Sequence, residues 1–351
     1  MSVQKSTIDR FSMPRPRLGA VAAPRHASSR LPARLRARLR ARPAGGLTGR
    51  TRPGPAGPVP PSRALRAAFT VLEHQPRLRG RFAEWLWFRL PAPPSAEERA
   101  QRTPTGGEPF EVAWSGGTVR GRVYGDWGLP TAYLVHGWGG WWQQLGAHVQ
   151  PLVDRGLCVV AFDAPSHGDS PRGRFGPRST TFPEMAEALT AVVADFGRPT
   201  LVVAHSAGAM AALLALDSGD VRPQALVLIA PPASVDPMLA FFADTVAVGK
   251  RSRAVMVERA ERRVGLPMGE LDLVTLAARQ RTLPALLVVH DHTDREAPFE
   301  GAVRLTTAWH GARLHATESL GHRRVLSDPA VVERVAELAA AAAERLSRPS
   351  R

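Results

Sequence analysis

Residues 201–208 read LVVAHSAG, an apolar strand that runs directly into Ser206 and then into the small residues Ala207 and Gly208. A serine in such a sharp strand-to-helix turn exposes its hydroxyl, and small neighbours let the backbones of strand and helix approach closely. The start of the following helix places free N–H groups and a positive dipole where negative charge would develop. The stretch therefore indicates an exposed serine at the end of a buried strand.

Short apolar runs recur along the chain and alternate with helix-length segments. The runs typical of strands buried on both faces are Thr131–Val135, Cys158–Phe162, Thr200–Ala204, Ala225–Ile229 and Ala285–Val289. The segments with helical character are Trp142–Arg155, Phe182–Phe196, Ala207–Asp217 and Pro329–Leu346. Ahead of them, Phe110–Ser115 and Thr118–Tyr124 alternate apolar and polar residues, which predicts an antiparallel hairpin. This order predicts an α/β fold, with a mostly parallel sheet and helices on both faces.

Between residues 233 and 282 the alternation lapses and helical character takes over. A span of that length is too long for a simple loop in a compact domain. We therefore expect a small helical cap over the carboxyl ends of the strands, with Phe241 and Phe242 facing the covered space. Connecting helices packed at the edge of the sheet are the open alternative.

The chain divides where its composition changes. Residues 1–61 are dominated by Arg, Pro, Ala and Gly, and we expect a disordered tail because they bury too little apolar area to offset the entropy of ordering. Residues 62–105 have the pattern of two helices divided at Pro76, followed by a linker. So short a segment cannot form its own core, so we expect it to pack on the main domain, residues 106–351.

The net charge of +15 belongs to the tail. Residues 1–60 carry 12 Arg and one Lys against one Asp, whereas residues 106–351 carry 25 basic and 26 acidic side chains. A near-neutral main domain does not favour a nucleic-acid partner. Leucines spaced four apart among the arginines of residues 30–42 allow a weak contact with an anionic membrane. A solvated polybasic tail, or an extension from a wrongly assigned start codon, explains the same residues.

Cys158 is the single cysteine, which excludes an intramolecular disulfide and a cysteine-based zinc site. No run of about 18 or more apolar residues is present. The first thirty residues lack the apolar core and cleavage site of a secretory signal. We therefore expect a cytoplasmic protein.

Four other motifs accompany LVVAHSAG in a fixed order. They are VHGWGG at 135–140, FDAPSHGDS at 162–170, HDHTDREAP at 290–298 and SLGHR at 319–323. Over residues 110–346 the chain resembles the alpha/beta-hydrolase superfamily, whose nucleophile turn has the form small-x-Ser-x-Gly. Ala204 stands where that family commonly has Gly, and Ser166 replaces the usual first Gly of the second loop. The resemblance implies an eight-stranded sheet.

The resemblance also implies a set of roles at the site. Ser206 would be the nucleophile, His322 its base and Asp294 the acid that orients the histidine. The backbone N–H groups of Trp138 and Ala207 would hold an oxyanion. Two other acids remain open for the third role, and these are Asp291 and Asp236.

Four further residues are candidates for a substrate pocket, namely His136, Trp141, Phe241 and Phe242. For His136 the alternative is a ring that only organises its loop, and for Trp141 it is a place in the core. His290 and His292 have no spacing that matches a closed set of metal ligands. We predict no metal and no cofactor.

The function that the resemblance implies is a serine hydrolase acting on a carboxylic ester through an acyl-enzyme. Thioesterase, amidase and membrane-surface lipase activities stay open, because fold and triad do not set the substrate. A non-catalytic member that binds a ligand or a partner protein is the alternative from another class. The expected partner is a small acyl compound, and the oligomeric state is open.

Overall fold

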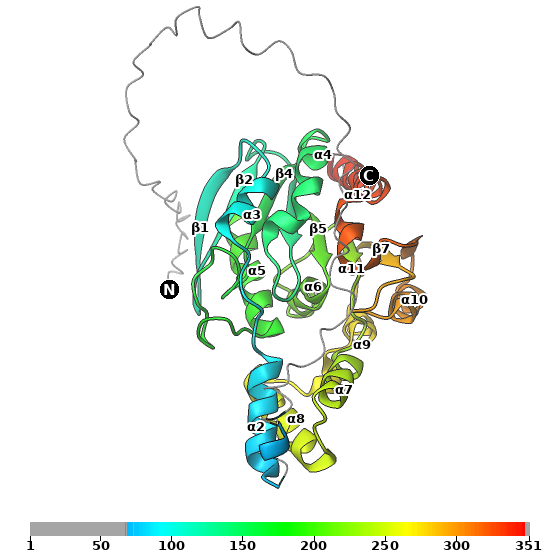
Figure 1. The fold of residues 1–351 in the computed structure, drawn as a ribbon. Coiled ribbons are helices and arrows are strands. Elements are labelled where there is room, and N and C mark those ends of the chain that lie inside the picture. Colours follow the sequence, from blue (N-terminus) through cyan, green and yellow to red (C-terminus); the bar gives the residue numbers. More distant parts are fainter. Residues whose placement is uncertain (1–66, 68, 73, 348–351) are drawn as a thin grey trace, which may run out of the picture. The chain divides into compact units, whose positions relative to one another are not determined.

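One eight-stranded sheet, in the order β1-β2-β4-β3-β5-β6-β7-β8, organises the chain (Figure 1). The computed structural model describes residues 67, 69–72 and 74–347, so the predicted tail at 1–61 lies outside the described residues. The strands are β1 Glu108–Trp114, β2 Gly117–Tyr124, β3 Thr131–Val135, β4 Cys158–Phe162, β5 Pro199–His205, β6 Ala225–Ile229, β7 Ala285–Asp291 and β8 Arg313–Thr317. β2 is antiparallel to β1 and β4, and the other neighbours pair in parallel. The predicted mostly parallel sheet is confirmed.

The strand order reverses at β3, which has β4 on one side and β5 on the other. In an open parallel sheet the loops on the two sides of such a point diverge and leave a crevice at the carboxyl ends of the strands. His136 follows β3 and Ser206 follows β5. The topology therefore brings VHGWGG at 135–140 and LVVAHSAG at 201–208 to the same crevice.

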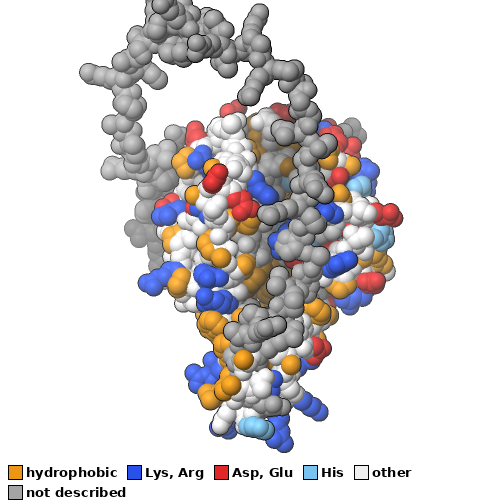
Figure 2. Space-filling view, in the orientation of Figure 1, with side chains coloured by type: hydrophobic (Ala, Val, Ile, Leu, Met, Phe, Trp, Pro, Cys, Tyr) orange, Lys and Arg blue, Asp and Glu red, His pale blue; other side chains and the backbone are white. Residues whose placement is uncertain are grey.

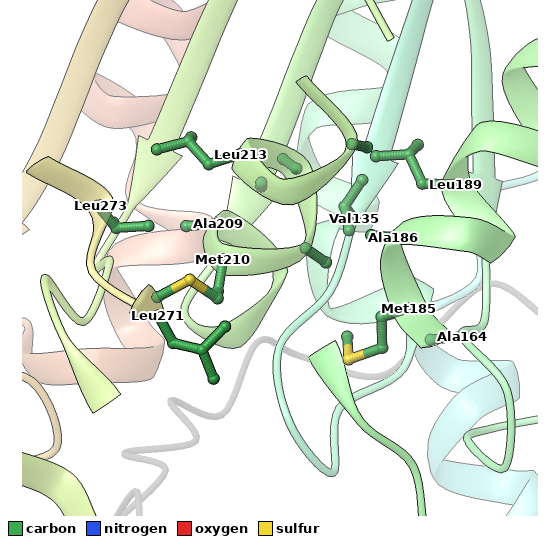
Figure 3. Close-up of a cluster of buried hydrophobic side chains, with 14 of the residues drawn as sticks. Val135, Ala164, Met185, Ala186, Leu189, Ala209, Met210, Leu213, Leu271 and Leu273 are labelled. Atoms are coloured by element: carbon green, nitrogen blue, oxygen red, sulfur yellow. The ribbon is translucent and has the colours of Figure 1, made fainter. Parts of the chain in front are cut away.

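Helices cover both faces of the sheet, as predicted. They are α2 Pro76–Trp87, α3 Ala96–Arg102, η2 Trp142–His148, α4 Val149–Val153, α5 Phe182–Phe196, α6 Ala207–Asp217, α7 Val235–Thr245, α8 Lys250–Val264, η3 Met268–Glu270, α9 Leu273–Ala278, α10 Phe299–Ala308, α11 Gly321–Arg324, η4 Val325–Ser327 and α12 Pro329–Ser347. On one face Met185 and Leu189 of α5 and Met210 and Leu213 of α6 gather around Val135 of β3 (Figure 3). On the other face η2, α4 and α12 form a second apolar cluster. Among the described helices, none has the length and apolar content to cross a bilayer.

The largest local difference from the sequence pattern lies at 142–155. One helix is expected there, and the structure has the 3₁₀ helix η2 followed by the short helix α4. Pro151 has no N–H to bond to the preceding turn, so an α-helix tolerates it only near its start, which is where α4 begins. The pattern also missed β8 and α10, because β8 is a partly exposed strand at the edge of the sheet with the mixed sequence RLHAT.

The predicted cap, residues 233–282, contains α7, α8, η3 and α9. α9 contacts α6 and α10, which lie on the sheet, whereas α8 packs along α2. Gly80 makes this close approach possible, because a Cβ at that position would lie 2.6 Å from both the Ser252 carbonyl oxygen and the Val255 Cβ. We call α2, α7 and α8 together the lid, and Figure 1 shows α2 and α8 side by side.

Polar contacts hold α2 to the rest of the lid. The buried carboxylate of Glu84 pairs with Arg263 at 3.0 Å and with Arg259 at 3.5 Å. Arg79, which is also buried on α2, donates a hydrogen bond to the Ala247 carbonyl oxygen at 2.6 Å. Arg263 also lies over the rings of Phe88 and Phe175. These contacts fasten α2 to the cap, whereas Arg99 of α3 forms an ion pair with Asp169 of the main domain at 2.9 Å.

Three buried histidines, His136, His148 and His167, belong to the core of the fold. Burial lowers the pKa of His136 and of His148 to about 4 and that of His167 to about 3. Bonds to backbone groups act in the opposite direction but do not compensate. All three rings are therefore neutral in the folded protein at neutral pH.

Replacing Gly80 with Ala tests the packing of α2 on α8. The added methyl group has no room, so we expect the free energy of unfolding to fall by about 1–3 kcal/mol, although Ala is the better helix former. Urea denaturation measures the change. Gly128→Ala is the matched control, since nothing lies within 4 Å of its added Cβ. Equal stability of the two variants would contradict the close approach.

The buried histidines predict a loss of stability in mild acid. An unfolded chain protonates its histidines near pH 6.5, whereas His136 and His148 resist protonation down to about pH 4 when folded. Between those values the unfolded state binds more protons, so the free energy of unfolding falls as the pH is lowered. Burial also raises the pKa of Asp163 to about 6 and raises that of Glu184, and these two carboxyls oppose the trend. The histidines outnumber them, because burial lowers the pKa of His205 and His290 too.

Urea titrations at about pH 7, 6 and 5 measure this loss. His148→Gln should make the decline less steep, and His310→Gln, at an exposed position, should leave it unchanged. A free energy of unfolding that stays constant over this range would contradict the burial of neutral rings.

Candidate active site

Ser206 lies in a strained turn between β5 and α6. Its φ is 50° and its ψ is −122°, a region of the backbone map that residues other than glycine rarely adopt. The Ser206 N–H donates to the Ile229 carbonyl oxygen at 2.9 Å, which ties the turn to the end of β6. The hydroxyl does not cap α6, and the side chain is partly exposed on the wall of a cavity. The turn therefore leaves the hydroxyl available to a ligand.

Two glycines allow the chain to pass close to this turn. A Cβ at Gly208 would lie 2.6 Å from the His136 carbonyl oxygen, and one at Gly137 would lie 2.9 Å from the Ser206 Cβ. Ala204, which replaces the commoner glycine, is fully buried within β5. The sheet accommodates its methyl group because the tight contacts are at Gly137 and Gly208.

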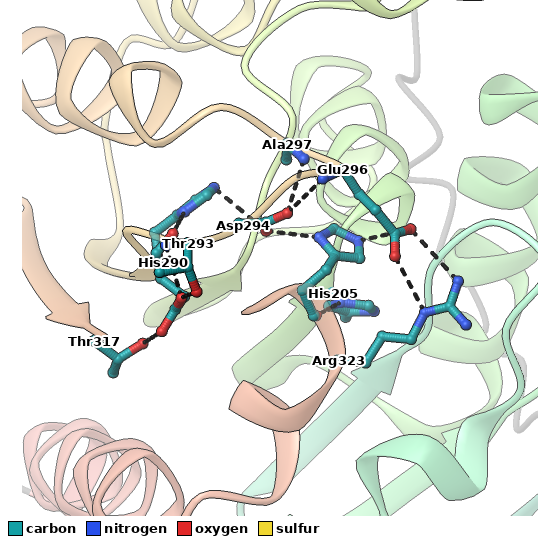
Figure 4. A network of polar contacts seen from close by, with 10 residues as sticks. His205, His290, Thr293, Asp294, Glu296, Ala297, Thr317 and Arg323 are labelled. Carbon is teal, nitrogen blue, oxygen red and sulfur yellow. Dashed lines mark hydrogen bonds and ion pairs between the residues drawn. The ribbon is translucent and has the colours of Figure 1, made fainter. Parts of the chain in front are cut away.

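His322 lies beside the cavity and contacts Asp294. The Nδ1 atom of His322 is 2.8 Å from Oδ2 of Asp294. The other oxygen of Asp294 accepts hydrogen bonds from the N–H groups of Glu296 at 2.8 Å and Ala297 at 3.0 Å (Figure 4). Burial alone would raise the pKa of Asp294, but these bonds and His322 hold it below its usual value. Asp294 is therefore ionised where it meets the ring.

The two competing acids are placed differently. Asp291 accepts hydrogen bonds from Thr293, from the Thr317 hydroxyl at 2.8 Å and from the Leu320 N–H at 2.9 Å. Burial opposes these bonds, yet together they lower the pKa of Asp291, so its carboxylate is engaged in joining three loop segments. Asp236 lies exposed in the first turn of α7. Of the three candidates, it is Asp294 that contacts His322.

A cavity of about 520 Å³ lies at the carboxyl ends of β3 and β5, between the sheet and the lid. Six of the residues singled out from the sequence line it, namely Ser206, His322, Trp138, Ala207, Trp141 and Phe242. The lid and the segment that follows α2 also line the cavity, and they contribute Leu86, Trp87, Phe88, Pro91, Ala92 and Met238. Apolar side chains thus make up most of the wall.

Two of the expected pocket residues do not line the cavity. His136 is buried behind the wall, where its Nε2 accepts a hydrogen bond from the Ala164 N–H and its Nδ1 bonds the Gly137 carbonyl oxygen. It therefore organises its loop and cannot reach a ligand. Phe241 points to solvent with 57% of its surface exposed, because its neighbour Phe242 occupies the inward face of α7.

The contribution of α2 to the cavity does not follow from the sequence pattern. Trp87 packs edge-on against Phe242, with ring centroids 5.3 Å apart, so α2, which precedes the main domain, and α7 of the cap both close the cavity. The apolar pattern of 82–90 signals burial but not the surface against which those side chains pack. Only a long-range contact between residues 76–87 and the cap reveals this wall.

His205, just before the nucleophile candidate, contacts the loop that carries His322. Its Nε2 is 3.0 Å from the His322 carbonyl oxygen, which requires the proton to be on that nitrogen. Burial, followed by the proximity of His322, lowers the pKa of His205 well below its usual value, so the ring is neutral. His205 therefore links the strand that carries Ser206 to the loop that carries His322.

Hydrogen bonds fix the loop after β3, to which Trp138 belongs. The Gly140 N–H donates to the Gly137 carbonyl oxygen at 3.0 Å, and the Gly139 N–H donates to Nε2 of His167 at 3.0 Å. Asp163, after β4, accepts the Trp142 N–H at 2.8 Å. The backbone around Trp138 is thus held from both ends and from the neighbouring loop.

A charged pair lies at the edge of the cavity (Figure 4). Glu296 is 3.4 Å from the Nε atom of Arg323, and its carboxylate is 4.0 Å from Nε2 of His322. Glu296 and Arg323 both line the cavity.

Within the described part of the chain, no group of three His, Cys, Asp or Glu side chains is placed to hold a metal ion.

Comparisons with known proteins agree with this architecture. A search of curated proteins by sequence found no match. Among solved structures, a membrane phospholipase A described as a bacterial virulence factor is 17% identical, with a TM-score of 0.52 over 80% of this chain and 96% of its own. Rv0554 from Mycobacterium tuberculosis is 17% identical, with a TM-score of 0.51 over 67% of this chain and 99% of its own.

A thioesterase domain from the curacin biosynthetic pathway is 15% identical, with a TM-score of 0.50 over 67% of this chain and 99% of its own. At these identities the structural likeness shows a shared fold. The sequence model of the alpha/beta hydrolase family matches residues 132–335, which include Ser206, Asp294 and His322. The chain therefore belongs to the alpha/beta hydrolase family.

Proposed function

We propose that the protein is a serine hydrolase that cleaves carboxylic esters through an acyl-enzyme. The observation that carries the proposal is the 2.8 Å contact between His322 and Asp294 beside the cavity that Ser206 also lines. A nucleophile, a base and a residue that orients the base are the parts that acyl transfer needs. Membership of the alpha/beta hydrolase family supports the same chemistry.

The first half-reaction forms the acyl-enzyme. Asp294 occupies Nδ1 of His322, so Nε2 is the nitrogen that takes the proton of the Ser206 hydroxyl. The Ser206 oxygen then attacks the carbonyl carbon of the ester, and the resulting oxyanion is held by the N–H groups of Trp138 and Ala207. As the tetrahedral intermediate collapses, the carbon–oxygen bond to the alcohol breaks and His322 returns the proton to the leaving alcohol.

The second half-reaction releases the acid. His322 removes a proton from water, the hydroxide oxygen attacks the acyl carbon, and the Ser206 oxygen leaves with the proton that His322 returns. Asp294 stays ionised throughout, because its hydrogen bonds lower its pKa. It stabilises the imidazolium that forms in each half-reaction.

The cavity wall supports an apolar substrate. Trp87, Phe242, Trp138 and Phe182 surround the position of Ser206 with aromatic surface. Apolar walls bind an apolar acyl or alcohol group by removing it from water, which is worth roughly 25 cal/mol per Å² of buried surface. An ester with an uncharged, apolar acyl group is therefore the proposed substrate class.

Hydrolysis of p-nitrophenyl esters, from acetate to palmitate, tests the proposal. We expect the wild type to hydrolyse at least one ester of the series and Ser206→Ala to lose that activity by about 10³-fold or more, because the nucleophile is gone. The chain-length optimum reports the size of the acyl site.

Ser218→Ala is the matched control, since Ser218 lies at the far end of the same helix and bonds a backbone carbonyl. A fluorophosphonate probe should label the wild type and the control but not Ser206→Ala. Full activity of Ser206→Ala would exclude Ser206 as the nucleophile. A wild type that neither hydrolyses the esters nor reacts with the probe would favour a ligand-binding role.

Two carboxylate variants separate the roles of the acids. Asp294→Asn presents an amide to Nδ1 and disfavours the tautomer that accepts a proton at Nε2, so we expect kcat to fall by about 10³- to 10⁴-fold. Asp291→Asn weakens the bonds to Thr293, Thr317 and Leu320, so its main effect should be a loss of stability. Steady-state kinetics and urea denaturation of both variants measure the two effects. A larger loss of kcat in Asp291→Asn would contradict this assignment.

A further inference from the structure

Exposed apolar side chains are concentrated near the lid. Within residues 67, 69–72 and 74–347, the large hydrophobic residues that are exposed are Val71, Leu78, Trp85, Trp127, Phe241 and Val303. Leu78 and Trp85 belong to α2, Val71 precedes that helix, and Phe241 belongs to α7. Scattered exposed hydrophobic residues are normal, but a concentration on one small element marks an interaction surface.

The most deeply buried face of α2 carries two charged residues and no large apolar one. Its buried residues are Arg79, Gly80, Ala83 and Glu84, whereas a surface helix ordinarily buries its apolar face. The opposite face carries Leu78, Arg81, Trp85 and, just beyond the helix, Arg89, at steps of three and four residues. We call these four residues the outer face of α2. Trp85 is 45% exposed, although burial of its ring would be favourable.

Positive charge accompanies this apolar surface. Arg77 and Arg81 are exposed, and the Arg89 guanidinium lies 4.8 Å from the centre of the Trp85 ring. α8 begins beside Gly80 with Lys250, Arg251 and Arg253. Among the described residues, no carboxylate is within ion-pair distance of any of these six cations. Figure 2 shows blue and orange side chains next to each other around this end of the lid.

α2 carries both the outer face and part of the cavity wall. Leu86 and Trp87, which follow Trp85, line the cavity, and Trp87 packs on Phe242, the neighbour of exposed Phe241. A partner that held Trp85 would therefore contact the helix that supplies Leu86 and Trp87 to the wall. The surface and the cavity thus share α2.

We propose that the outer face of α2 docks on a lipid bilayer that contains anionic phospholipids. Trp85 and Leu78 would enter the boundary between headgroups and acyl chains, and the unpaired arginines would contact the phosphates. A second copy of the chain fits this surface poorly, because two arginine-rich faces repel each other. The proposal goes beyond the hydrolase function and does not depend on it.

Co-sedimentation of the full chain with vesicles tests the docking. The protein carries Ser206→Ala, so that lipid hydrolysis cannot disturb the measurement, and the vesicles contain phosphatidylcholine alone or mixed with phosphatidylglycerol. We expect binding to the mixed vesicles and weaker binding at high salt, which screens the arginines. Replacing Leu78 and Trp85 with Ser, or Arg77 and Arg81 with Gln, should lower the partition coefficient by about tenfold or more.

Trp127→Ser and Arg304→Gln are the matched controls. Trp127 is an exposed tryptophan of the main domain that contacts Phe196, and Arg304 is exposed on α10. Both controls should bind as the parent does. Equal binding of the α2 variants and the parent would overturn the proposal and place any lipid contact elsewhere, for example in residues 30–42. No binding of the parent to mixed vesicles would overturn it as well.

A second measurement does not rely on serine substitutions. Brominated acyl chains quench tryptophans that enter the bilayer, so part of the quenching should disappear in Trp85→Phe and stay in Trp127→Phe. Unchanged quenching in Trp85→Phe would contradict insertion of α2.

Size-exclusion chromatography adds a third readout. If the parent is a dimer and the Leu78 and Trp85 variant is a monomer, the surface belongs to a second copy of the chain, and the lipid proposal is overturned.

Discussion

The site depends on the close approach of three backbone segments around Ser206. The positive φ of Ser206 is strained for a serine, and it is kept because the Ile229 carbonyl fixes the turn from one side while Gly137 and Gly208 let the β3 loop and α6 close on it from the other. A side chain at either glycine would push these segments apart. The same approach brings the start of α6 and the loop of Trp138 to the cavity.

Buried polar side chains turn that approach into a fixed geometry. His136, Asp163 and His167 each accept a hydrogen bond from a backbone N–H of the neighbouring loops, so the ends of β3 and β4 are joined by side chains as well as by the sheet. Burial keeps the histidines neutral, which preserves a lone pair on the accepting nitrogen. Near Asp294 and His322, Asp291 accepts a hydrogen bond from the Leu320 N–H, and His205 donates one to the His322 carbonyl oxygen.

The lid is held by a different interaction, the ion pairs of Glu84 with Arg259 and Arg263. Because α2 uses its polar residues to bind α8, its apolar residues remain for two other surfaces. Leu86 and Trp87 face the cavity, and Trp85 faces outward. One short helix thereby contributes to the cavity wall and to the proposed lipid contact.

The local sequence determined the first seven strands, the turn at Ser206 and the order of the motifs, because burial on both faces and tight turns restrict residue type at each position. It also left Asp294, Asp291 and Asp236 as rival acids, and it placed His136 and Phe241 in the pocket. Only the tertiary structure separated the acids, since the contact with His322 depends on how the loops after β7 and β8 meet. It alone brought α2 to the cap, because no periodicity within residues 76–87 encodes the surface of α8 on which they pack.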